Sequence, residues 1–461
     1  MRVINMLRQC SNKVSRSFNF SSHVLMFRPI NKRKPSIRKY TTVPSRLISF
    51  DLRELFEQPR NLDYASKYQL ITALDAAKTD TIPKCSLMLV RDFIDNSLYN
   101  PYYGYFSKQA VIFSPENFNF INIKDNLQFM RMLSKTYAVI ENEMNETDKV
   151  ARQVWHTSTE LFKPWYGYAV AKHIVEKYKA TEQNPHHELI IYEMGAGNGT
   201  LMLNILDYIK QYEHSIYQQT RYRSIFEWNE IEPNPCFFIA FEVLDNFAHD
   251  AICYDTETEE PLQGIVITDE KGEYEDVYEP VTDPLILRYL STRDKTSYKT
   301  PVLHKWRALR KLRHRMPFAP SLTKPEFLPT KALLFLEIIN EYFPRHRLLI
   351  SDFFKLPETI PGVDAPVVQT RFERTMVPCS TYMVQPGYFD IFFPTNFELL
   401  KNIYQVLRAG GKSDGNIQSQ EIQVSTQKDF LKKYADLEKT RTRSGENPML
   451  LYYENIKFLF T

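Results

Sequence analysis

The sequence predicts an α/β fold with a doubly wound, largely parallel sheet, and three neighbouring stretches carry this prediction. Residues 188–194 (ELIIYEM) and 237–240 (FFIA) are short apolar runs with the length and side-chain branching of buried strands. Between them, residues 200–212 (TLMLNILDYIKQY) repeat apolar side chains with the spacing of a helix that packs on a sheet. A buried strand that leads through a glycine-rich turn into such a helix is typical of folds that bind a nucleotide-containing cofactor.

Apolar periodicity predicts three further helices. One covers residues 86–100 with Ser86 as its N-cap, one lies around residues 126–144, and one covers residues 165–178. The largely polar stretch from 107 to 153, which contains the second of these helices, is interpreted as an insertion into the sheet fold.

Length and composition limit the class of protein. The 461 residues are 43% hydrophobic, which allows a large core in one elaborated domain or two ordinary ones. No apolar run approaches the roughly 18 residues of a membrane-spanning helix, so we expect no transmembrane segment. Five scattered cysteines, without a CxxC pair or a Cys/His cluster, predict neither a disulfide framework nor a metal site. They are Cys10, Cys85, Cys236, Cys253 and Cys379.

The first fifty residues contain eleven lysines and arginines and no acidic residue. Interleaved with serine and apolar residues, this composition predicts a mitochondrial transit peptide over residues 1–40, processed just before Thr41. A disordered basic arm for nucleic acid is the alternative. Cleavage after Tyr40 would leave 48 basic against 55 acidic residues, so the mature chain would be mildly acidic. That balance argues against a general nucleic-acid binder.

The turn at residues 193–200 (EMGAGNGT) places three of the chain's thirteen glycines within five positions. Glycine lets the backbone approach a ligand closely, and the N-terminus of the following helix offers unpaired N–H groups. A phosphate-binding loop would need a lysine before Thr200, and a dinucleotide fingerprint would need glycine at that position. The remaining pattern, E-x-G-x-G-x-G, is typical of class I S-adenosylmethionine-dependent methyltransferases. A glycine-rich turn without a ligand is the alternative.

In that pattern the acid that closes the strand, Glu193, would hydrogen-bond the ammonium group of the cofactor's methionine. The backbone of Gly195, Gly197 and Gly199 would lie against its nucleoside. Two more acids, Glu242 and Asp245, fall just beyond the strand at 237–240. The carboxyl ends of parallel strands line the ligand crevice in open α/β sheets, so we expect these two carboxylates at the reaction centre. Two acids on a solvated loop are the alternative.

Seven stretches in succession resemble the blocks of the MidA-type family, the mitochondrial protein arginine methyltransferases that assist complex I assembly. The resemblance covers most of residues 80–461, and any single block would be weak evidence. The matching stretches are SLMLVRDFIDNSLYNPYYGYF (86–106), TSTELFKPWYG (157–167), YEMGAGNGTLM (192–202), FEVLDNFAHD (241–250), LLISDFF (348–354), PGYFDIFFPTNFELL (386–400) and TQKDFL (426–431).

This resemblance implies a Rossmann-like class I methyltransferase sheet with helical insertions. The domain would span residues 80–461, with its core at 157–280 and 331–461 and insertions at 107–153 and 281–330 that cap the crevice. Matched positions add Thr200 to the cofactor-binding residues and give Glu242 and Asp245 as catalytic residues. The family's block around Glu242 usually has an asparagine where this chain has Phe241, and its histidine position is too altered for His249 to be taken as functional.

A larger departure follows the 200–212 helix. The fold normally continues with a second strand, which ends in an acid that holds the ribose, and then with another helix. This chain passes from the helix almost directly to the 237–240 strand, and the expected segment is missing near Ser224 and Ile225. Glu227 and Glu230 are the available substitutes for the ribose-binding acid.

The resemblance therefore predicts a matrix enzyme that uses S-adenosylmethionine to dimethylate an arginine symmetrically in a protein partner, with a complex I subunit as the expected substrate. The alternatives are a scaffold that has lost methyl transfer and a small-molecule methyltransferase. A basic segment at 304–315 is interpreted as a docked amphipathic helix or a contact for an acidic partner. An acidic stretch at 255–279 is either a polar hairpin or an attractor for a cationic substrate.

Overall fold

The structure, a computed structural model, describes residues 67–108, 110–144, 153–181, 187–225, 230–303, 320–357, 359–360, 362–372, 375–410 and 421–461. The predicted transit peptide at 1–40, the basic segment at 304–315 and Glu227 lie outside these residues. Among the described helices, none is both long and apolar enough to span a bilayer.

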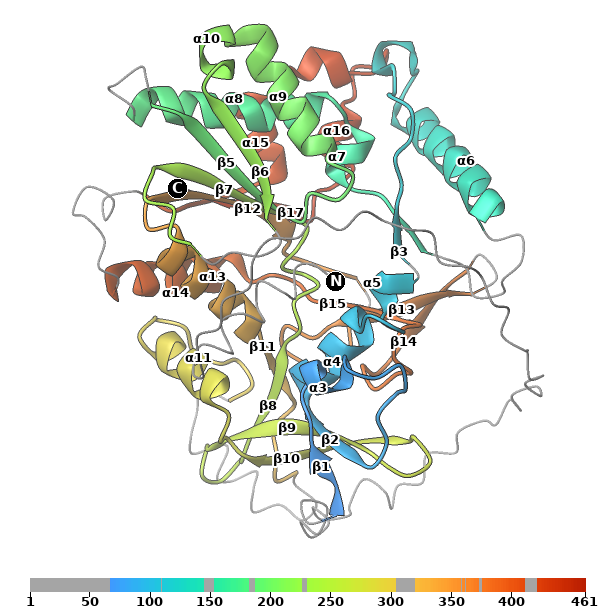
Figure 1. The fold of residues 1–461 in the computed structure, drawn as a ribbon. Helices are drawn as coiled ribbons and strands as arrows, with labels where there is room; N and C mark the ends of the chain where they lie inside the picture. The colour runs from blue at the N-terminus through green and yellow to red at the C-terminus, as the bar shows by residue number, and fades with distance from the viewer. Residues whose placement is uncertain are drawn as a thin grey trace.

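The central sheet has the strand order β16-β17-β12-β7-β5-β6 (Figure 1). Strands β6, β5, β7 and β12 run parallel, and β17 is inserted antiparallel between β12 and β16. This is the doubly wound α/β sheet that the sequence predicts. The strands are β5 (Leu189–Met194), β6 (Thr220–Ile225), β7 (Cys236–Phe241), β12 (His346–Phe353), β16 (Gln423–Thr426) and β17 (Ile456–Phe460).

Helices cover both faces of this sheet, which is why its inner strands are apolar throughout. Side chains such as Ile191 and Ile239 pack against α8 (Trp165–Thr181), α9 (Thr200–Tyr212) and α15 (Gln427–Tyr434). Their neighbours Ile190 and Phe238 point the other way, toward α13 (Thr330–Tyr342) and α14 (Phe397–Gly410).

A second sheet, in the lower half of Figure 1, has the order β1-β2-β9-β8-β11, with β10 paired to β9. The chain reaches it directly from β7, so the stretch expected as one core at 157–280 contributes to two sheets. The acidic stretch at 255–279 forms its β9–β10 hairpin. The strands are β1 (Gln69–Leu70), β2 (Ser86–Leu89), β8 (Asp250–Tyr254), β9 (Pro261–Thr268), β10 (Tyr274–Pro280) and β11 (Glu326–Leu328).

Shorter elements complete the described chain. A three-stranded sheet has the order β14-β13-β15, and β3 pairs with β4. Their bounds are β3 (Ala110–Ile112), β4 (Gln153–Trp155), β13 (Val367–Phe372), β14 (Thr375–Cys379) and β15 (Asp390–Phe392). The remaining helices are α3 (Ala73–Ala76), α4 (Val90–Tyr99), α5 (Tyr105–Lys108), η3 (Phe120–Asn122), α6 (Asn126–Met144), α7 (Ser158–Leu161), α10 (His214–Tyr217), α11 (Pro284–Asp294), η4 (Leu437–Thr440) and α16 (Pro448–Leu451).

Five predicted elements are confirmed: the helices α6, α8 and α9 and the strands β5 and β7. The predicted helix over 86–100 is wrong in its first turn. Ser86 to Leu89 form β2, which pairs with β1 and β9, and α4 begins only at Val90. Ser86 is therefore buried in a strand and caps nothing. Pairing with distant strands outweighs the local helical pattern here.

The prediction that no second strand follows α9 is also wrong. Strand β6 (Thr220–Ile225) pairs parallel with β5 along its whole length, from Leu189 opposite Thr220 to Met194 opposite Ile225. Its residues, TRYRSI, alternate between half-buried and exposed positions up to Ser224 and lack the apolar run of an inner strand, because β6 forms the edge of the described sheet. The missing segment therefore begins after β6, and no described strand extends the sheet beyond it.

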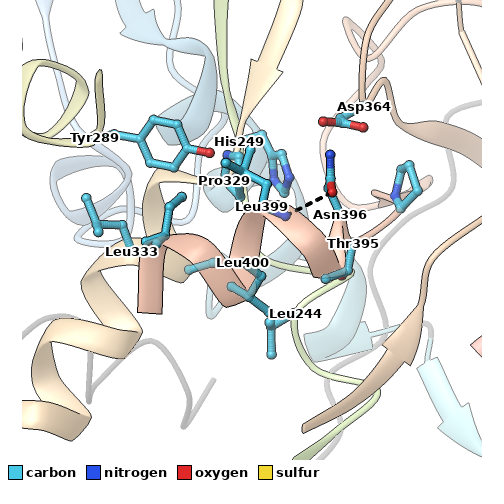
Figure 2. A pocket seen from close by; sticks show the side chains of 13 residues that line it. Leu244, His249, Tyr289, Pro329, Leu333, Asp364, Thr395, Asn396, Leu399 and Leu400 are labelled. Atoms are coloured by element: carbon cyan, nitrogen blue, oxygen red, sulfur yellow. Dashed lines mark hydrogen bonds between the residues drawn. The ribbon is translucent and has the colours of Figure 1, made fainter. Parts of the chain in front are cut away.

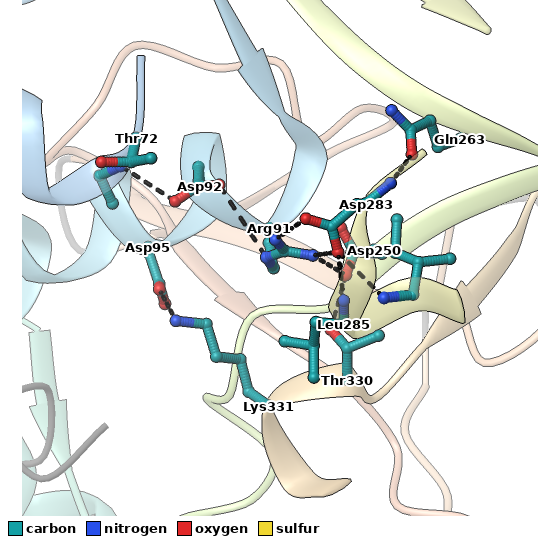
Figure 3. Close-up of polar contacts among 12 residues, drawn as sticks. Thr72, Arg91, Asp92, Asp95, Asp250, Gln263, Asp283, Leu285, Thr330 and Lys331 are labelled. Carbon is teal, nitrogen blue, oxygen red and sulfur yellow. Dashed lines mark hydrogen bonds and ion pairs between the residues drawn. The ribbon is translucent and has the colours of Figure 1, made fainter. Parts of the chain in front are cut away.

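A buried ion-pair network joins four elements at the contact between the two sheets (Figure 3). The Arg91 guanidinium of α4 donates to Asp250 of β8 at 2.9 Å and, through two nitrogens, to Asp283 at 2.8 and 2.6 Å. Asp283 also caps α11 through the backbone N–H groups of Leu285 and Ile286, and Thr330 of α13 donates to Asp250 at 2.6 Å. One cation therefore holds α4, β8, α11 and α13 together.

We expect Arg91→Met to lower the free energy of unfolding by about 3–5 kcal/mol, because it leaves the buried carboxylate of Asp250 and the half-buried carboxylate of Asp283 without their cation. Urea denaturation measures this change. Arg288→Met is the matched control, since the pair between Arg288 and Glu337 is partly exposed and should contribute less than about 1 kcal/mol. Equal losses in the two variants would contradict the proposed importance of the network.

Candidate active site

The glycine turn between β5 and α9 has a backbone that excludes side chains. Gly195, Gly197 and Gly199 have φ values of 77°, 52° and 78°, in the left-handed region that L-residues rarely adopt. A Cβ added to Gly195 would lie 2.6 Å from Val243, and one added to Gly197 would lie 2.7 Å from Ile112. The clustering of glycines thus has a conformational and a steric cause, and the backbone of Gly195 and Gly197 remains exposed.

A cavity of about 340 Å³ lies beside this turn, at the carboxyl ends of β5, β7 and β12. Of the seven predicted site residues, only Gly199 does not line this cavity. The six that do are Glu193, Gly195, Gly197, Thr200, Glu242 and Asp245. Aromatic side chains form much of the remaining wall: Phe106, Trp155, Phe241, Phe353, Phe392 and Tyr453. The predicted insertion at 107–153 contributes Ile112, whereas no lining residue comes from 281–330. The second candidate for a ribose-binding acid, Glu230, is exposed and does not line the cavity.

A second hollow lies under α14 and is much smaller (Figure 2). Its volume of about 20 Å³ suits a single water molecule, so it is far too small for a nucleoside. His249 lines it, buried, with its ring stacked on Phe393 at a centroid distance of 3.9 Å. That packing agrees with the interpretation that His249 is structural.

Glu193 closes β5 and is buried at the edge of the large cavity. The Tyr222 hydroxyl of β6 donates to its carboxylate at 2.9 Å. Burial raises the pKa of Glu193 to about 7, although the hydrogen bond from Tyr222 works in the opposite direction. Strand β6, which the sequence analysis missed, therefore orients Glu193, the acid that the sequence analysis predicted at the cofactor site.

Glu160 lies in the short helix α7 and holds the glycine turn through Asn198 and Thr200. Its carboxylate accepts four hydrogen bonds, from Thr200 at 2.7 Å, Ser114 at 2.8 Å, Asn198 at 3.2 Å and Lys163 at 3.2 Å. Burial alone would raise the pKa of Glu160, but the bonds from Thr200, Ser114 and Lys163 outweigh it and lower the pKa. The sequence contains this residue in a matched block without indicating its role.

The turn that follows β7 is held by a single carboxylate. Asp352, at the end of β12, accepts the backbone N–H groups of Val243, Leu244 and Asp245 at 3.2, 2.8 and 3.2 Å with one oxygen. Glu242 begins this turn with a φ of 51°, an uncommon value for a residue with a side chain. Sequence reasoning missed Asp352, although it lies in the quoted stretch LLISDFF.

The two predicted catalytic carboxylates both face this cavity. Glu242 accepts the backbone N–H of Ser158 at 3.2 Å, and burial, with repulsion from Asp352, raises its pKa to about 8. Asp245 is only 6% exposed, and its Oδ1 has no hydrogen-bond partner among the described residues. Burial first, and then repulsion from Asp352, Asp390 and Glu242, raises the pKa of Asp245 well above its ordinary value.

Asp390 is the fifth acid that lines the cavity, and the sequence analysis did not single it out. It begins β15 of the three-stranded sheet and is 1% exposed. Burial raises its pKa to about 8, opposed by a hydrogen bond from the backbone of Ile391. The only available signal was its place in a stretch that matched the family.

Buried acids away from this cavity have cationic partners in the described chain, whereas among the buried acids of the cavity wall only Glu160 has one. Asp95, Glu160, Asp250 and Glu326 form ion pairs with Lys331, Lys163, Arg91 and Arg293. The other buried acids, which take part in no ion pair among the described residues, are Glu193, Asp245, Asp352 and Asp390. Unpaired buried carboxylates are costly, so their concentration at one cavity indicates a site that receives a cation.

The model of an S-adenosyl-L-methionine-dependent methyltransferase family, Methyltransf_28, matches residues 169–226 and 225–411. The chain belongs to this family. The two matched stretches of the methyltransferase meet at the end of β6, where the family's expected segment is missing. The match confirms the predicted kind of fold and S-adenosyl-L-methionine as the cofactor.

One relative of the methyltransferase agrees with the predicted MidA-type resemblance. A Schizosaccharomyces pombe protein named "Protein arginine methyltransferase NDUFAF7 homolog, mitochondrial" is 21% identical over 373 residues, covering 70% of this chain and 76% of that protein. A Burkholderia thailandensis structure bound to S-adenosyl-homocysteine, described as a "likely methyl transferase", is similar, with 12% identity, a TM-score of 0.47, and coverage of 81% of this chain and 88% of the other. A native structure of a superfamily protein from the same organism has a TM-score of 0.46 and 12% identity, with coverage of 81% and 87%.

The residues of the cavity fit this cofactor. The backbone of the glycine turn is exposed to the cavity at Gly195 and Gly197, and the N-terminus of α9 follows directly at Thr200. Glu193 offers a carboxylate at the cavity edge for a positively charged ammonium group. The cavity volume lies in the range of small-molecule sites.

We expect Gly197→Val to weaken binding of S-adenosyl-L-methionine more than tenfold, as measured by calorimetric titration. A branched side chain at a φ of 52° is strained by about 1–2 kcal/mol, and its atoms would compete with Ile112 for the cavity edge. Gly445→Val is the matched control, because Gly445 has a φ of 90° but lies in open space away from the cavity. Unchanged affinity in Gly197→Val, or an equal loss in the control, would show that the turn does not form the cofactor site.

Proposed function

We propose that this methyltransferase transfers a methyl group to an arginine side chain of a protein substrate. The observation that carries the proposal is the group of cation-free buried carboxylates around the cavity beside the glycine turn. A neutral or anionic acceptor would leave these carboxylates uncompensated, whereas a guanidinium would pair with them. The name of the fission yeast relative, a protein arginine methyltransferase homolog, supports the same acceptor.

For the cofactor side, we assign the contacts to Glu193, the turn glycines and Thr200. Glu193 would pair with the ammonium group, and the backbone of Gly195, Gly197 and Gly199 would lie along the nucleoside. Thr200 is itself held by Glu160 at 2.7 Å, so its position depends on that carboxylate. When bound, S-adenosyl-L-methionine supplies a methyl group already activated on a sulfonium sulfur, so the protein mainly aligns the acceptor.

For the acceptor side, we assign Glu242 and Asp245. Arginine is a weak nucleophile because its guanidinium is delocalised and stays protonated, with a pKa above about 12. Two carboxylates that accept its N–H groups hold it in one orientation and concentrate electron density on one terminal nitrogen. Methylation of that nitrogen releases a proton. A carboxyl such as Glu242, whose pKa burial raises to about 8, can accept a proton near neutral pH.

The finer features of the proposal are symmetric dimethylation of the arginine, a complex I subunit as substrate and a location in the mitochondrial matrix. The acid-free basic stretch at 1–40 and the word mitochondrial in the relative's name support the location. The MidA-type resemblance supports the type of dimethylation and the substrate.

A non-catalytic scaffold is the second candidate, and one observation favours it. Among the described residues the sheet ends at β6, so the ribose has no acid in the usual position. Calorimetry separates the two candidates. A scaffold that had lost the cofactor would give no heat with S-adenosyl-L-methionine, whereas the enzyme binds it.

We expect Glu242→Gln and Asp245→Asn each to reduce methyl transfer to arginine-containing protein roughly 10- to 100-fold, the loss for a charged hydrogen bond of about 1.5–3 kcal/mol. Transfer of a radiolabelled methyl group measures the rate. Affinity for S-adenosyl-L-methionine should stay within twofold of the wild-type value, because neither side chain is assigned to the cofactor. A variant with full activity would remove that residue from the acceptor site.

In cells that lack the protein, we expect symmetric dimethylarginine to disappear from at least one mitochondrial protein. Quantitative mass spectrometry of mitochondrial extracts measures this loss, and re-expression of the wild type but not of Gly197→Val should restore the modification. Unchanged protein methylation together with an altered methylated metabolite would favour a small-molecule acceptor instead.

A further inference from the structure

We propose that Asp390 completes the acceptor site as a specificity-determining residue, binding the cationic side chain of the substrate together with Asp245. The inference rests on the proposed function, and it extends that function to a residue from a separate sheet. Three observations about Asp390 carry it: its place in the cavity wall, its lack of a cationic partner and its attachment to the turn that holds Asp245.

The first observation is placement. Asp390 starts β15, which pairs with β13 and is far in sequence from the glycine turn and from β7. Its side chain nevertheless lines the cavity with Glu242 and Asp245, although it is only 1% exposed. A short strand of a small sheet therefore delivers a nearly buried carboxylate to the wall of the site.

The second observation is that no positively charged side chain of the described chain neutralises Asp390. The Oδ1 atoms of Asp390 and Asp245 both have no hydrogen-bond donor among the described residues. Neither carboxylate takes part in an ion pair of the described chain, in contrast to Asp250 and Glu326, which Arg91 and Arg293 neutralise. A buried acid kept for stability alone would be expected to have such a partner.

The third observation is that the chain next to Asp390 is hydrogen-bonded to the turn that holds Asp245. The backbone N–H of Phe393, directly after β15, donates to the backbone carbonyl of Asp245 at 2.8 Å. The Asp352 carboxylate accepts the backbone N–H of Asp245 at 3.2 Å. The positions of Asp245 and Asp390 are thus coupled through the backbone, so the two carboxylates form one rigid receptor. A guanidinium presents five N–H donors in one plane and can bridge two such acceptors.

The charge state of this receptor depends on the cation. Burial raises the pKa of Asp390 to about 8, and the charge of Asp390 in turn raises the pKa values of Asp245, Tyr99 and Tyr105. Both tyrosines have raised pKa values and stay neutral in the working range. A bound cation stabilises the ionised carboxylates, so binding at pH 7 should release protons, and affinity should rise between pH 6 and pH 9.

The test is calorimetric titration of the purified protein with a short arginine peptide and with its citrulline counterpart, which has nearly the same shape but no charge. The wild type should bind the arginine peptide at least tenfold more tightly, with proton release visible as a dependence of the heat on the buffer. Asp390→Asn should lose at least tenfold in affinity for the arginine peptide and release fewer protons. Asp364→Asn is the matched control, because Asp364 is also an acid whose pKa burial raises, to about 6, but it lines the small hollow instead.

Stability and kinetics separate this role from a structural one. Asp390→Asn removes an uncompensated buried charge, so its melting temperature should be equal to or above that of the wild type, whereas a structural acid would lower it. In transfer assays the variant should raise KM for the arginine substrate more than it lowers kcat. Wild-type affinity and KM in Asp390→Asn would overturn the inference while leaving the proposed function intact. Arginine binding that requires Asp390 but leads to no methyl transfer would instead overturn the proposed function.

Discussion

The carboxylate of Asp352 holds the turn on which the architecture of the site depends. By accepting three successive backbone N–H groups, it fixes the chain directly after β7, at the point where the polypeptide leaves the central sheet for the second sheet. That turn carries Glu242 and Asp245 into the cavity, and its far end continues into β8, where Asp250 joins the Arg91 network. The site and the contact between the two sheets are therefore built on one short segment.

The site is assembled around acids that have different tasks. Glu160 and Asp352 accept several hydrogen bonds each and act as anchors for the two turns that meet at the cavity. Glu193, Asp245 and Asp390 have few donors or none, and burial raises the pKa of each. The difference is physical: a carboxylate satisfied by the protein's own N–H and O–H groups positions backbone, whereas an unsatisfied one is available to a positively charged ligand.

Much of the fold could be predicted because the signals are local. The helices α8 and α9 and the strands β5 and β7 have apolar periods that can be read within a dozen residues. The glycine turn was recognisable because glycine is rare in this chain and three glycines occur together. Strand β2 was mistaken for a helical turn, and β6 was missed, because both depend on partners: β2 on the distant β9, and β6 on β5 alone as an edge strand. In the site, Asp352 and Asp390 were missed for the same reason, since their roles arise from contacts with a turn far away in sequence.

The sequence by itself determined the succession of strand β5, helix α9 and strand β7, the left-handed turn that only glycine tolerates, and the presence of acids at the carboxyl ends of these two strands. These are properties of short stretches, in which side-chain size and spacing act on the adjacent backbone. Only the tertiary structure decided which acids stay without a cation. Whether a buried carboxylate is neutralised depends on lysines and arginines brought in from other elements, as Arg91 is for Asp250 and as no described residue is for Asp245 or Asp390. Long-range packing sets those distances, and no local pattern of residues encodes them.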